Sequence, residues 1–376
     1  MKIIKRVDLA KQWKKEKSEL LPLIIKTFES GEYIGSNEID KLEKKIANYC
    51  GTKYAVCTNS GTDSLTLALY LLGVRKGDEV ITPPNSFIAS ASSIAHLGAK
   101  PVFADVKKDQ LIDPIEVEKK ITKKTKAIMV VHLCGRIADM KSIKKISNKY
   151  NLPIIEDAAQ AIGSKYDGKK SGSFGEFGCF SAHPLKNLNA CGDSGFITTN
   201  NKNYYKKLKI LINHGLENRN MSSSFAYVSR MDALQATILN YRLKNLDEKI
   251  NKRRKIASIY FKQLKNLPIL LPIETKEEYN SYHLFVIQTK KRRELQKFLK
   301  KNKIETGIHY PIPIHLQKAA KYLGYKKGTF KNTESQSKRI LSLPINENLD
   351  KKDIDFICKK IINFFNEKKN SKLPKN

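Results

Sequence analysis

The sequence predicts an α/β protein, with a large domain whose mostly parallel sheet is flanked by helices and a smaller α+β domain at the C-terminal end. Two observations lead to this fold class. Short β-branched apolar runs alternate with amphipathic segments of helical spacing, which is typical of a doubly wound sheet. The chain has 376 residues, more than a single core usually holds, so two domains are expected, residues 1–246 and residues 247–376.

The elements of the large domain follow from apolar periodicity and from residues that start or stop helices. A lead-in helix is predicted over residues 8–30, because Leu20, Ile24 and Phe28 recur at helical spacing and Gly31 ends the pattern. Further helices are predicted at residues 37–49, 58–72, 88–97, 202–212 and 231–246, with one that starts near Pro114. Strands are predicted at residues 54–57, 79–82, 101–105, 127–132, 152–157, 177–180 and 195–199.

The small domain is expected after a charged segment, residues 247–254. Its strands and helices alternate differently from those of the large domain, and one strand is predicted at residues 282–287. This pattern favours a small α+β layer.

Composition limits the class of protein. The formal net charge is +33, but the lysines run along the whole chain and no basic motif is interleaved with base-stacking aromatics, so no nucleic-acid partner is expected. The sequence contains no long apolar run, which predicts no membrane insertion and a cytoplasmic location. The 6 cysteines form no CxxC pair and no zinc-type cluster with histidine, which predicts reduced thiols and no metal site.

The stretch of residues 152–197 carries the candidate catalytic groups. Its first apolar run ends at Asp157, which is therefore expected at the carboxyl end of a strand, where ligands sit in open α/β sheets. The next run leads into Ser181 and Lys186, so a hydroxyl and an amine would leave the following strand end. An acid, a hydroxyl and a lysine in one crevice could hold a phosphorylated, protonated heterocycle and bond covalently to its aldehyde.

Motifs in this stretch also carry a family resemblance. They are Asp157-Ala-Ala-Gln160, Phe180-Ser181-Ala-His-Pro-Leu-Lys186-Asn-Leu and Gly192-Asp193-Ser-Gly195. In this order and spacing they resemble the DegT/DnrJ/StrS-type sugar aminotransferases, which are fold type I pyridoxal phosphate enzymes. The likeness extends from Gly31 to Pro344. It implies a mixed, mostly parallel sheet, pyridoxal phosphate (PLP) or its pyridoxamine form (PMP) as the cofactor, and a homodimer with the active site at the subunit interface.

The resemblance implies roles around the cofactor ring. Lys186 would bond to the aldehyde and then shuttle a proton, and Asp157 would keep the pyridine nitrogen protonated. Gln160 would approach the 3-oxygen, and Phe87 would stack on the ring, although a phenylalanine in this pattern is also typical of a core. His132 matches a family motif and is interpreted as structural support near the crevice.

The resemblance also implies a phosphate site. Ser181 would bind the phosphate through its hydroxyl. Gly61, Thr62 and Asp63 follow a predicted strand and open a helix, where free backbone amides favour an anion. An ordinary capped turn is the alternative for this segment taken alone, and the downstream lysine motif favours phosphate binding.

Substrate contacts are expected further along the chain. Arg230 could bind the carboxylate of the amino acid donor or brace the subunit interface. His309 and Tyr310 lie in a segment that resembles one near the family's substrate entrance, with a packing role as the alternative. Val228 stands where many members carry an asparagine contributed to the neighbouring subunit's phosphate site, which puts that contact in question.

The sequence therefore predicts a homodimeric aminotransferase that moves an amino group from an amino acid, glutamate, to a nucleotide-linked ketosugar. The motifs look most like those of members acting on 3-keto sugars, such as a 3-keto-6-deoxy sugar, in the biosynthesis of an amino sugar for a surface polysaccharide or a glycosylated product. Two alternatives stay open. A PLP-dependent sugar dehydratase would have histidine in place of Lys186, and a non-catalytic sugar-sensing regulator is favoured only by Val228.

Overall fold

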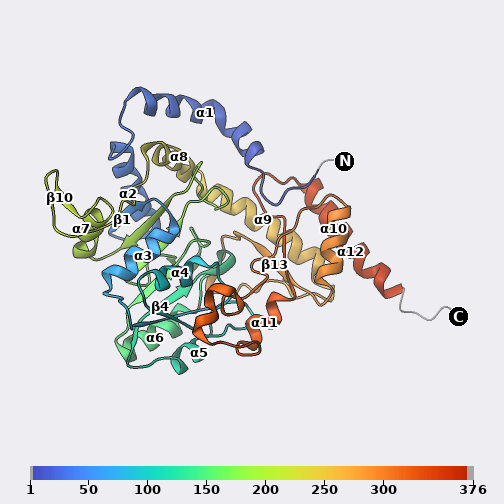
Figure 1. The fold of residues 1–376 in the computed structure, drawn as a ribbon. Helices are drawn as coiled ribbons and strands as arrows, with labels where there is room; N and C mark the ends of the chain where they lie inside the picture. Colours follow the sequence, from blue (N-terminus) through green and yellow to red (C-terminus); the bar gives the residue numbers. More distant parts are fainter. Residues whose placement is uncertain (1–2, 371–376) are drawn as a thin grey trace.

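A 7-stranded sheet forms the centre of the computed structural model, which describes residues 3–370 (Figure 1). Neighbouring strands lie in the order β1-β9-β8-β5-β4-β2-β3. The strands from β8 to β3 pair in parallel, whereas β9 runs antiparallel to both β8 and β1. Their bounds are β1 Tyr54–Thr58, β2 Glu79–Thr82, β3 Lys100–Phe103, β4 Thr125–Val131, β5 Ile154–Asp157, β8 Phe177–Ser181 and β9 Gly195–Thr199. The predicted fold class, a mixed and mostly parallel sheet in an α/β protein, is confirmed.

Helices cover both faces of this sheet because its strands are apolar on both sides. In β4, Ala127 and Met129 pack with α3, α4 and α7, whereas Ile128 and Val130 point the other way and pack with α5 and α6. The helices α2 and α8 pack on β1, β8 and β9. The bounds are α2 Asn37–Cys50, α3 Gly61–Leu71, α4 Ala89–His96, α5 Pro114–Lys119, α6 Met140–Tyr150, α7 Lys202–Leu211 and α8 Ala233–Lys244.

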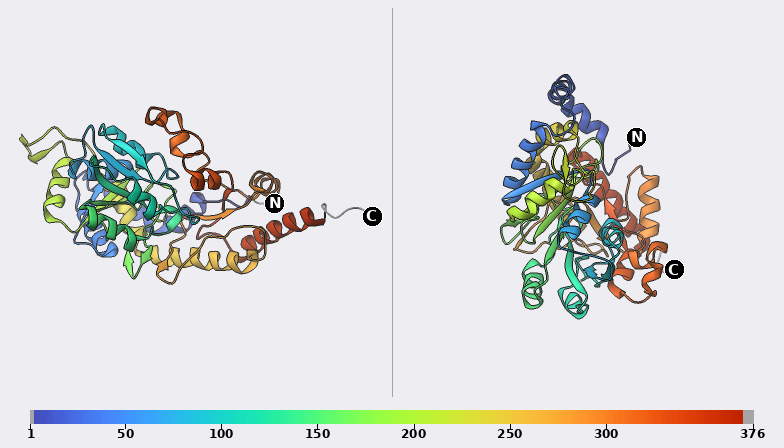
Figure 2. Two further views of the ribbon diagram at one scale, coloured as in Figure 1. Left: turned by 90° about the horizontal axis from the view of Figure 1, so that it is seen from below. Right: turned by 60° about the vertical axis from the view of Figure 1, so that its left-hand side comes forward.

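A second core lies in the C-terminal part of the chain. The antiparallel strands β13 and β14 pack with α9, α10 and α12 around large buried side chains such as Tyr260 and Phe285. Figure 2 shows α9 running from beneath the sheet toward α12. The bounds are α9 Leu246–Leu264, α10 Arg292–Lys301, α11 Lys331–Ser337, α12 Lys351–Asn370, β13 Phe285–Gln288 and β14 Ile340–Leu343. The division of the chain after residue 246 stays a prediction.

Residues 247–254 were expected only as a charged segment that leads into the small domain, and the structure shows that they are helical. These residues form the first turns of α9, in which Ile250 packs with α2 and α8 while Asp247, Glu248 and Lys252 are exposed. Two small sheets lie outside the two cores. One contains β6 Lys165–Tyr166, β7 Lys169–Lys170 and β12 Glu278–Tyr279, and the other is a hairpin of β10 Leu216–Asn218 and β11 Met221–Ser222. Within residues 3–370, no helix combines the length and apolar character needed to cross a membrane.

The lead-in helix is confirmed as α1, Leu9–Glu29, which lies across α8. A buried carboxylate fastens the two helices. Glu16 on α1 forms ion pairs with Arg242 at 2.8 Å and with Lys249 at 2.9 Å. Burial acts to raise the pKa of Glu16, but the charge and hydrogen bond of Lys249, together with Arg242, hold this pKa below its usual value.

Replacing Arg242 by methionine should destabilise the fold by about 3 kcal/mol, because a buried carboxylate loses a hydrogen-bonded partner. The contribution of Glu16 to stability is present above the usual carboxylate pKa and is lost as the pH falls, so the difference between wild type and variant should shrink in acid. Urea unfolding at several pH values measures this. The control is Lys252→Met, whose pair with Glu248 is exposed, and an equal loss in both variants would contradict the assignment.

Candidate active site

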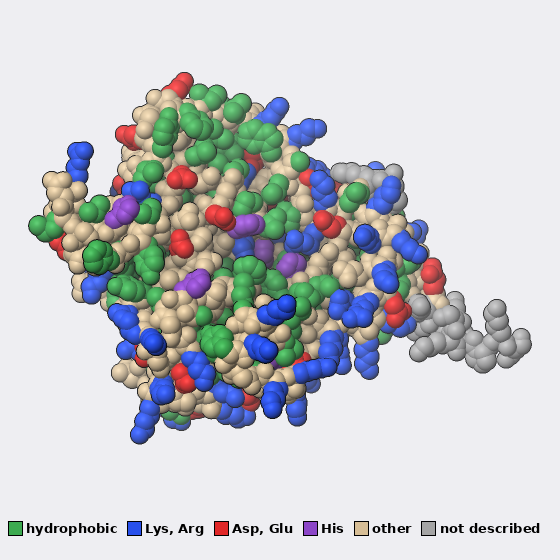
Figure 3. Space-filling model, viewed as in Figure 1, with side chains coloured by type: hydrophobic (Ala, Val, Ile, Leu, Met, Phe, Trp, Pro, Cys, Tyr) green, Lys and Arg blue, Asp and Glu red, His purple; other side chains and the backbone are tan. Residues whose placement is uncertain are grey.

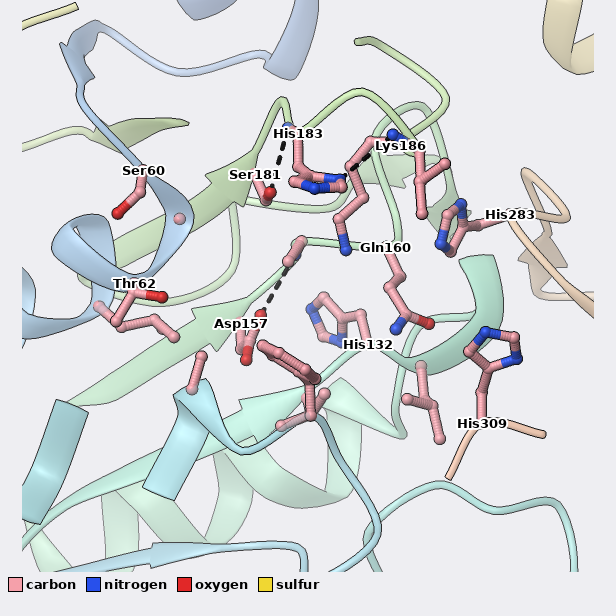
Figure 4. A pocket seen from close by; sticks show the side chains of 18 of the residues that line it. Ser60, Thr62, His132, Asp157, Gln160, Ser181, His183, Lys186, His283 and His309 are labelled. Atoms are coloured by element: carbon pink, nitrogen blue, oxygen red, sulfur yellow. Dashed lines mark hydrogen bonds between the residues drawn. The ribbon is translucent and has the colours of Figure 1, made fainter. Parts of the chain in front are cut away.

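A cavity of about 330 Å³ lies at the carboxyl ends of β4, β5 and β8, beside the N-terminus of α3. Parallel pairing brings these strand ends to one edge of the sheet, so residues far apart in sequence meet there. Sequence-predicted site residues that line it are Gly61, Thr62, Phe87, Asp157, Gln160, Ser181, Lys186, His309 and Tyr310. Figure 4 shows Ser60 and Thr62 on one side of the cavity and His283 and His309 on the other.

Asp157 is the last residue of β5 and is buried, with 6% of its surface exposed. Its Oδ2 accepts a hydrogen bond from the hydroxyl of Ser90 on α4 at 2.7 Å, and its Oδ1 accepts one from the backbone amide of Ala159 at 3.2 Å. Burial raises the pKa of Asp157, and these hydrogen bonds and the charge of Lys186 limit the rise. A carboxylate held in this way can bind a cationic group that enters the cavity.

Lys186 lies on the turn after β8, where its backbone amide donates to the carbonyl of His183 at 2.8 Å. Its amine points into the cavity between Ser181 and Gln160 (Figure 4). Burial lowers the pKa of Lys186, and the charge of Asp157 opposes this effect. The amine is therefore biased toward its neutral, nucleophilic form relative to a lysine in water.

One end of the cavity is built to receive an anion. Ser60 caps α3 by accepting a hydrogen bond from the amide of Asp63 at 3.1 Å, while the amides of Gly61 and Thr62, the first of the helix, have no intrahelical acceptor. Ser181 lies directly against this turn, because a Cβ on Gly61 would stand 2.7 Å from the Cβ of Ser181. A helix N-terminus beside a hydroxyl favours a phosphate group.

Gln160 and two aromatic rings line the cavity at the carboxyl end of β5. The Oε1 of Gln160 accepts a hydrogen bond from the amide of Cys134 at 2.8 Å, and the Nε2 of Gln160 donates to the hydroxyl of Tyr310 at 3.1 Å. The ring of Phe87 lies 5.7 Å from that of Tyr310, centroid to centroid, and is 55% exposed. Phe87 is therefore a cavity-facing ring and not a core residue.

Two predicted residues lie outside the cavity lining. The carboxylate of Asp63 accepts a hydrogen bond from the hydroxyl of Ser229 at 2.8 Å, and the backbone amide of Asp63 donates to the hydroxyl of Ser60. Arg230 donates to Oδ1 of Asn213 at 2.9 Å. Val228, 53% exposed, forms a bridge with the same Asn213, so both residues belong to the segment beside the β10–β11 hairpin.

Several lining residues were not among the predicted contacts: Arg6, His183, Asp193 and His283. His183 and Asp193 occur within the quoted motifs, so their positions were accessible from the sequence. Arg6 and His283 reach the cavity through tertiary packing that no local pattern encodes. His132, expected as structural support, lines the cavity and places its Nε2 3.0 Å from Oε2 of the buried Glu156.

The groups present fit one class of cofactor. A half-buried amine, a buried carboxylate and a helix N-terminus beside a hydroxyl are the partners that a phosphorylated pyridine aldehyde requires. With this sheet, they define an aminotransferase-like PLP enzyme. The chain belongs to the DegT/DnrJ/EryC1/StrS aminotransferase family, whose sequence model matches residues 14–362. The resemblance predicted from the motifs is confirmed.

Curated relatives of this chain match over most of its length. A dTDP-3-amino-3,6-dideoxy-alpha-D-galactopyranose transaminase of Aneurinibacillus thermoaerophilus is 40% identical over 94% of this chain and 98% of its own. A pleiotropic regulatory protein of Geobacillus stearothermophilus is 39% identical over 96% of this chain and 98% of its own.

Solved structures of similar proteins share the fold. DesV of S. venezuelae, in complex with a ketimine intermediate, superposes with a TM-score of 0.95 at 35% identity, over 97% of this chain and 99% of its own. NtdA of Bacillus subtilis with bound PMP superposes with a TM-score of 0.87 at 31% identity, over 94% of this chain and 82% of its own. The cofactor class predicted from the motifs is thus that of structurally solved relatives.

The lowered pKa of Lys186 predicts that its amine reacts with an acylating reagent at lower pH than the amine of N-acetyl-lysine amide. Asp157→Asn removes a charge that raises this pKa, so the reaction profile should move to still lower pH. Peptide mass spectrometry after timed labelling measures both profiles. A wild-type profile that coincides with that of the free lysine derivative would contradict the burial of this amine.

Proposed function

We propose that this protein is a PLP-dependent aminotransferase that moves an amino group from an amino acid to a nucleotide-linked ketosugar. The observation that carries the proposal is the amine of Lys186 and the carboxylate of Asp157 in one cavity with the N-terminus of α3. The relative named for a 3-amino-3,6-dideoxy sugar supports a 3-keto-6-deoxy sugar as the acceptor. Glutamate would be the donor, and the product would be an amino sugar for a surface polysaccharide or another glycosylated product.

When bound, PLP supplies a protonated pyridine ring that accepts negative charge from the reacting amino acid carbon. Asp157 would hold the proton on the ring nitrogen, because its own carboxylate is screened from water and fixed by Ser90. Lys186 would bond to the aldehyde carbon and leave when the donor amine arrives. Its amine would then carry a proton between the reacting carbon of the amino acid and the aldehyde carbon of the cofactor.

The remaining lining groups would bind and orient the cofactor. The amides of Gly61 and Thr62 and the hydroxyl of Ser181 would hold the phosphate at the α3 end. Phe87 would lie on one face of the ring, and Gln160 would approach the 3-oxygen. These contacts fix the ring plane with respect to the lysine amine.

Substrate contacts would come from the opposite end of the cavity. His309 and Tyr310 line this end, and the hydroxyl of Tyr310 accepts a hydrogen bond from Gln160. Arg230 points to Asn213, which supports the bracing role for it over a contact with the donor. Asp63 would act indirectly, by holding the α3 turn to Ser229.

A second copy of the chain would complete the assembly. Exposed hydrophobic side chains occur on α1 and around the β10–β11 hairpin, where Phe225 is fully exposed beside Val228. Figure 3 shows hydrophobic side chains gathered over α1 and near this hairpin, while lysine and arginine spread over the rest of the face. Apolar patches of this kind are typical of an interface. We propose a homodimer with the active site at that interface.

The described cysteines are free thiols, and most are buried. Proteins of the reducing cytoplasm have this pattern. We therefore propose that the enzyme acts in the cytoplasm.

A non-catalytic regulator is the second candidate. The relative named as a pleiotropic regulatory protein and the valine at position 228 favour it. The presence of Lys186 favours an aminotransferase over both a regulator and a dehydratase with histidine at this position.

The purified protein mixed with PLP should show the visible absorbance band of a lysine-bound cofactor, and glutamate should abolish this band as the amino group is transferred. Lys186→Ala should lack the band, whereas Lys123→Ala, at an exposed site, should keep it. Spectra before and after glutamate measure all three. A wild-type protein that shows no band with excess cofactor would refute the aminotransferase proposal.

Asp157→Asn should reduce the rate of the glutamate half-reaction by several orders of magnitude, because an amide cannot hold the ring nitrogen protonated. Stopped-flow spectroscopy of the PLP-loaded variant measures this rate. Asp113→Asn is the control, since asparagine can cap α5 as aspartate does. Near-normal turnover in Asp157→Asn would show that Asp157 is not the partner of the ring nitrogen.

A further inference from the structure

Arg6 supplies the cavity with a cation that none of the roles above uses. Long-range pairing puts it there. Ile4 forms a parallel bridge with Ile304, its amide donates to the carbonyl of Lys303 at 2.9 Å, and its carbonyl accepts from the amide of Glu305 at 3.0 Å. The N-terminal segment is therefore held against the C-terminal core at Ile4, two residues before Arg6 in the cavity wall.

The backbone of Arg6 is fixed on both sides. Its amide donates to Oε2 of Glu305 at 2.7 Å, and its carbonyl accepts from Nδ2 of Asn346 at 3.2 Å. Gly307 leaves space for the side chain, because a Cβ there would stand 3.4 Å from Nε of Arg6 and 2.8 Å from Cε1 of His309. The Arg6 side chain is thus held at the His309 end of the cavity.

The guanidinium of Arg6 has no ionic partner within residues 3–370. The charge of Glu305 acts on this guanidinium, but the Glu305 carboxylate binds the Arg6 backbone amide and does not come within ion-pair distance of the side chain. Neither Asp157 nor Asp193, which line the same cavity, pairs with it. Burial lowers the pKa of Arg6, yet a guanidinium stays charged at neutral pH. A half-buried cation without a counter-charge favours an anionic ligand.

The position of this cation indicates which ligand it meets. Burial, assisted by the charges of Arg6 and Lys186, lowers the pKa of the His309 imidazole to about 4. The imidazole is therefore neutral near pH 7, and it lies at the side of the cavity away from the α3 end that suits the cofactor phosphate (Figure 4). An amino acid whose amine would replace that of Lys186 on the aldehyde carbon carries a carboxylate on the same carbon as its amine, and an acidic sugar carries a carboxylate on its ring.

We propose that Arg6 binds a carboxylate of the substrate, from the amino acid donor or from an acidic sugar, through its forked guanidinium. The identity of the substrate rests on the proposed function. The existence of a carboxylate subsite at Arg6 rests on the geometry alone. Guanidinium groups bind carboxylates through two parallel hydrogen bonds, which also orient the ligand.

The test compares Arg6→Gln with Lys5→Gln in the PLP-loaded protein. Lys5→Gln removes the same charge from the same segment. The Lys5 side chain, however, faces solvent and pairs with Asp8 at 3.6 Å. Arg6→Gln should keep the visible band and raise the glutamate concentration that half-saturates the half-reaction about 10- to 100-fold. Arg6→Lys should recover part of the loss, and Lys5→Gln should match wild type.

Different ligands separate the two sources of the carboxylate. An equal loss with glutamate and with alanine assigns Arg6 to the α-carboxylate, and a loss with glutamate alone assigns it to the side-chain carboxylate. If both amino acids react normally, weaker calorimetric binding of UDP-glucuronate, with UDP-glucose unchanged, assigns Arg6 to an acidic sugar. The proposal would be overturned if Arg6→Gln reacted with and bound every one of these ligands as Lys5→Gln does.

Calorimetry with 2-oxoglutarate keeps this inference separate from the proposed function. If the wild type shows no transamination but binds 2-oxoglutarate or UDP-glucuronate through Arg6, the aminotransferase proposal fails and the carboxylate subsite stands. If the wild type transaminates and Arg6→Gln behaves as Lys5→Gln in turnover and in calorimetry, the subsite fails alone.

Discussion

Two adjacent buried carboxylates at the end of β5 are the constraint around which the site is built. Because successive strand residues point to opposite faces, Glu156 and Asp157 must be satisfied separately. Glu156 accepts backbone hydrogen bonds from the turn of residues 172–175 and lies 3.0 Å from a ring nitrogen of His132. Asp157, on the other face, accepts a hydrogen bond from the hydroxyl of Ser90. The turn and α4 must therefore both close on this strand end, and α4 contributes Ala89 to the cavity wall.

Close backbone contact at the other strand ends depends on missing side chains. A Cβ on Gly195 would stand 2.7 Å from the amide nitrogen of Gly61, and one on Gly61 would meet Ser181. The α3 N-terminus can therefore lie directly on the ends of β8 and β9. This contact keeps the helix amides, the Ser181 hydroxyl and the Lys186 turn at fixed separations, so that one rigid ligand can engage all of them.

Local pattern was sufficient for the strands of the central sheet and for the groups at their ends, because buried parallel strands are short apolar runs and ligands gather where they finish. Asp157 and Lys186 were found in this way. Spacing could not tell which way a side chain points, so Asp63 was expected at the phosphate, and Arg230 at either the donor carboxylate or the subunit interface, although neither lines the cavity. Nor could it find Arg6, whose position depends on strand pairing with residues about 300 positions later in the chain.

The pairing of Ile4 with Ile304 ties the amino end of the chain to the mouth of the cavity. A bulky label attached to this segment would therefore stand a few residues from the cavity that Lys186 lines and would compete with ligands for access. Helix α12 ends away from the sheet, beyond the second core (Figure 1). The carboxyl end is thus the better place to attach a label or a surface anchor when ligand binding is to be measured.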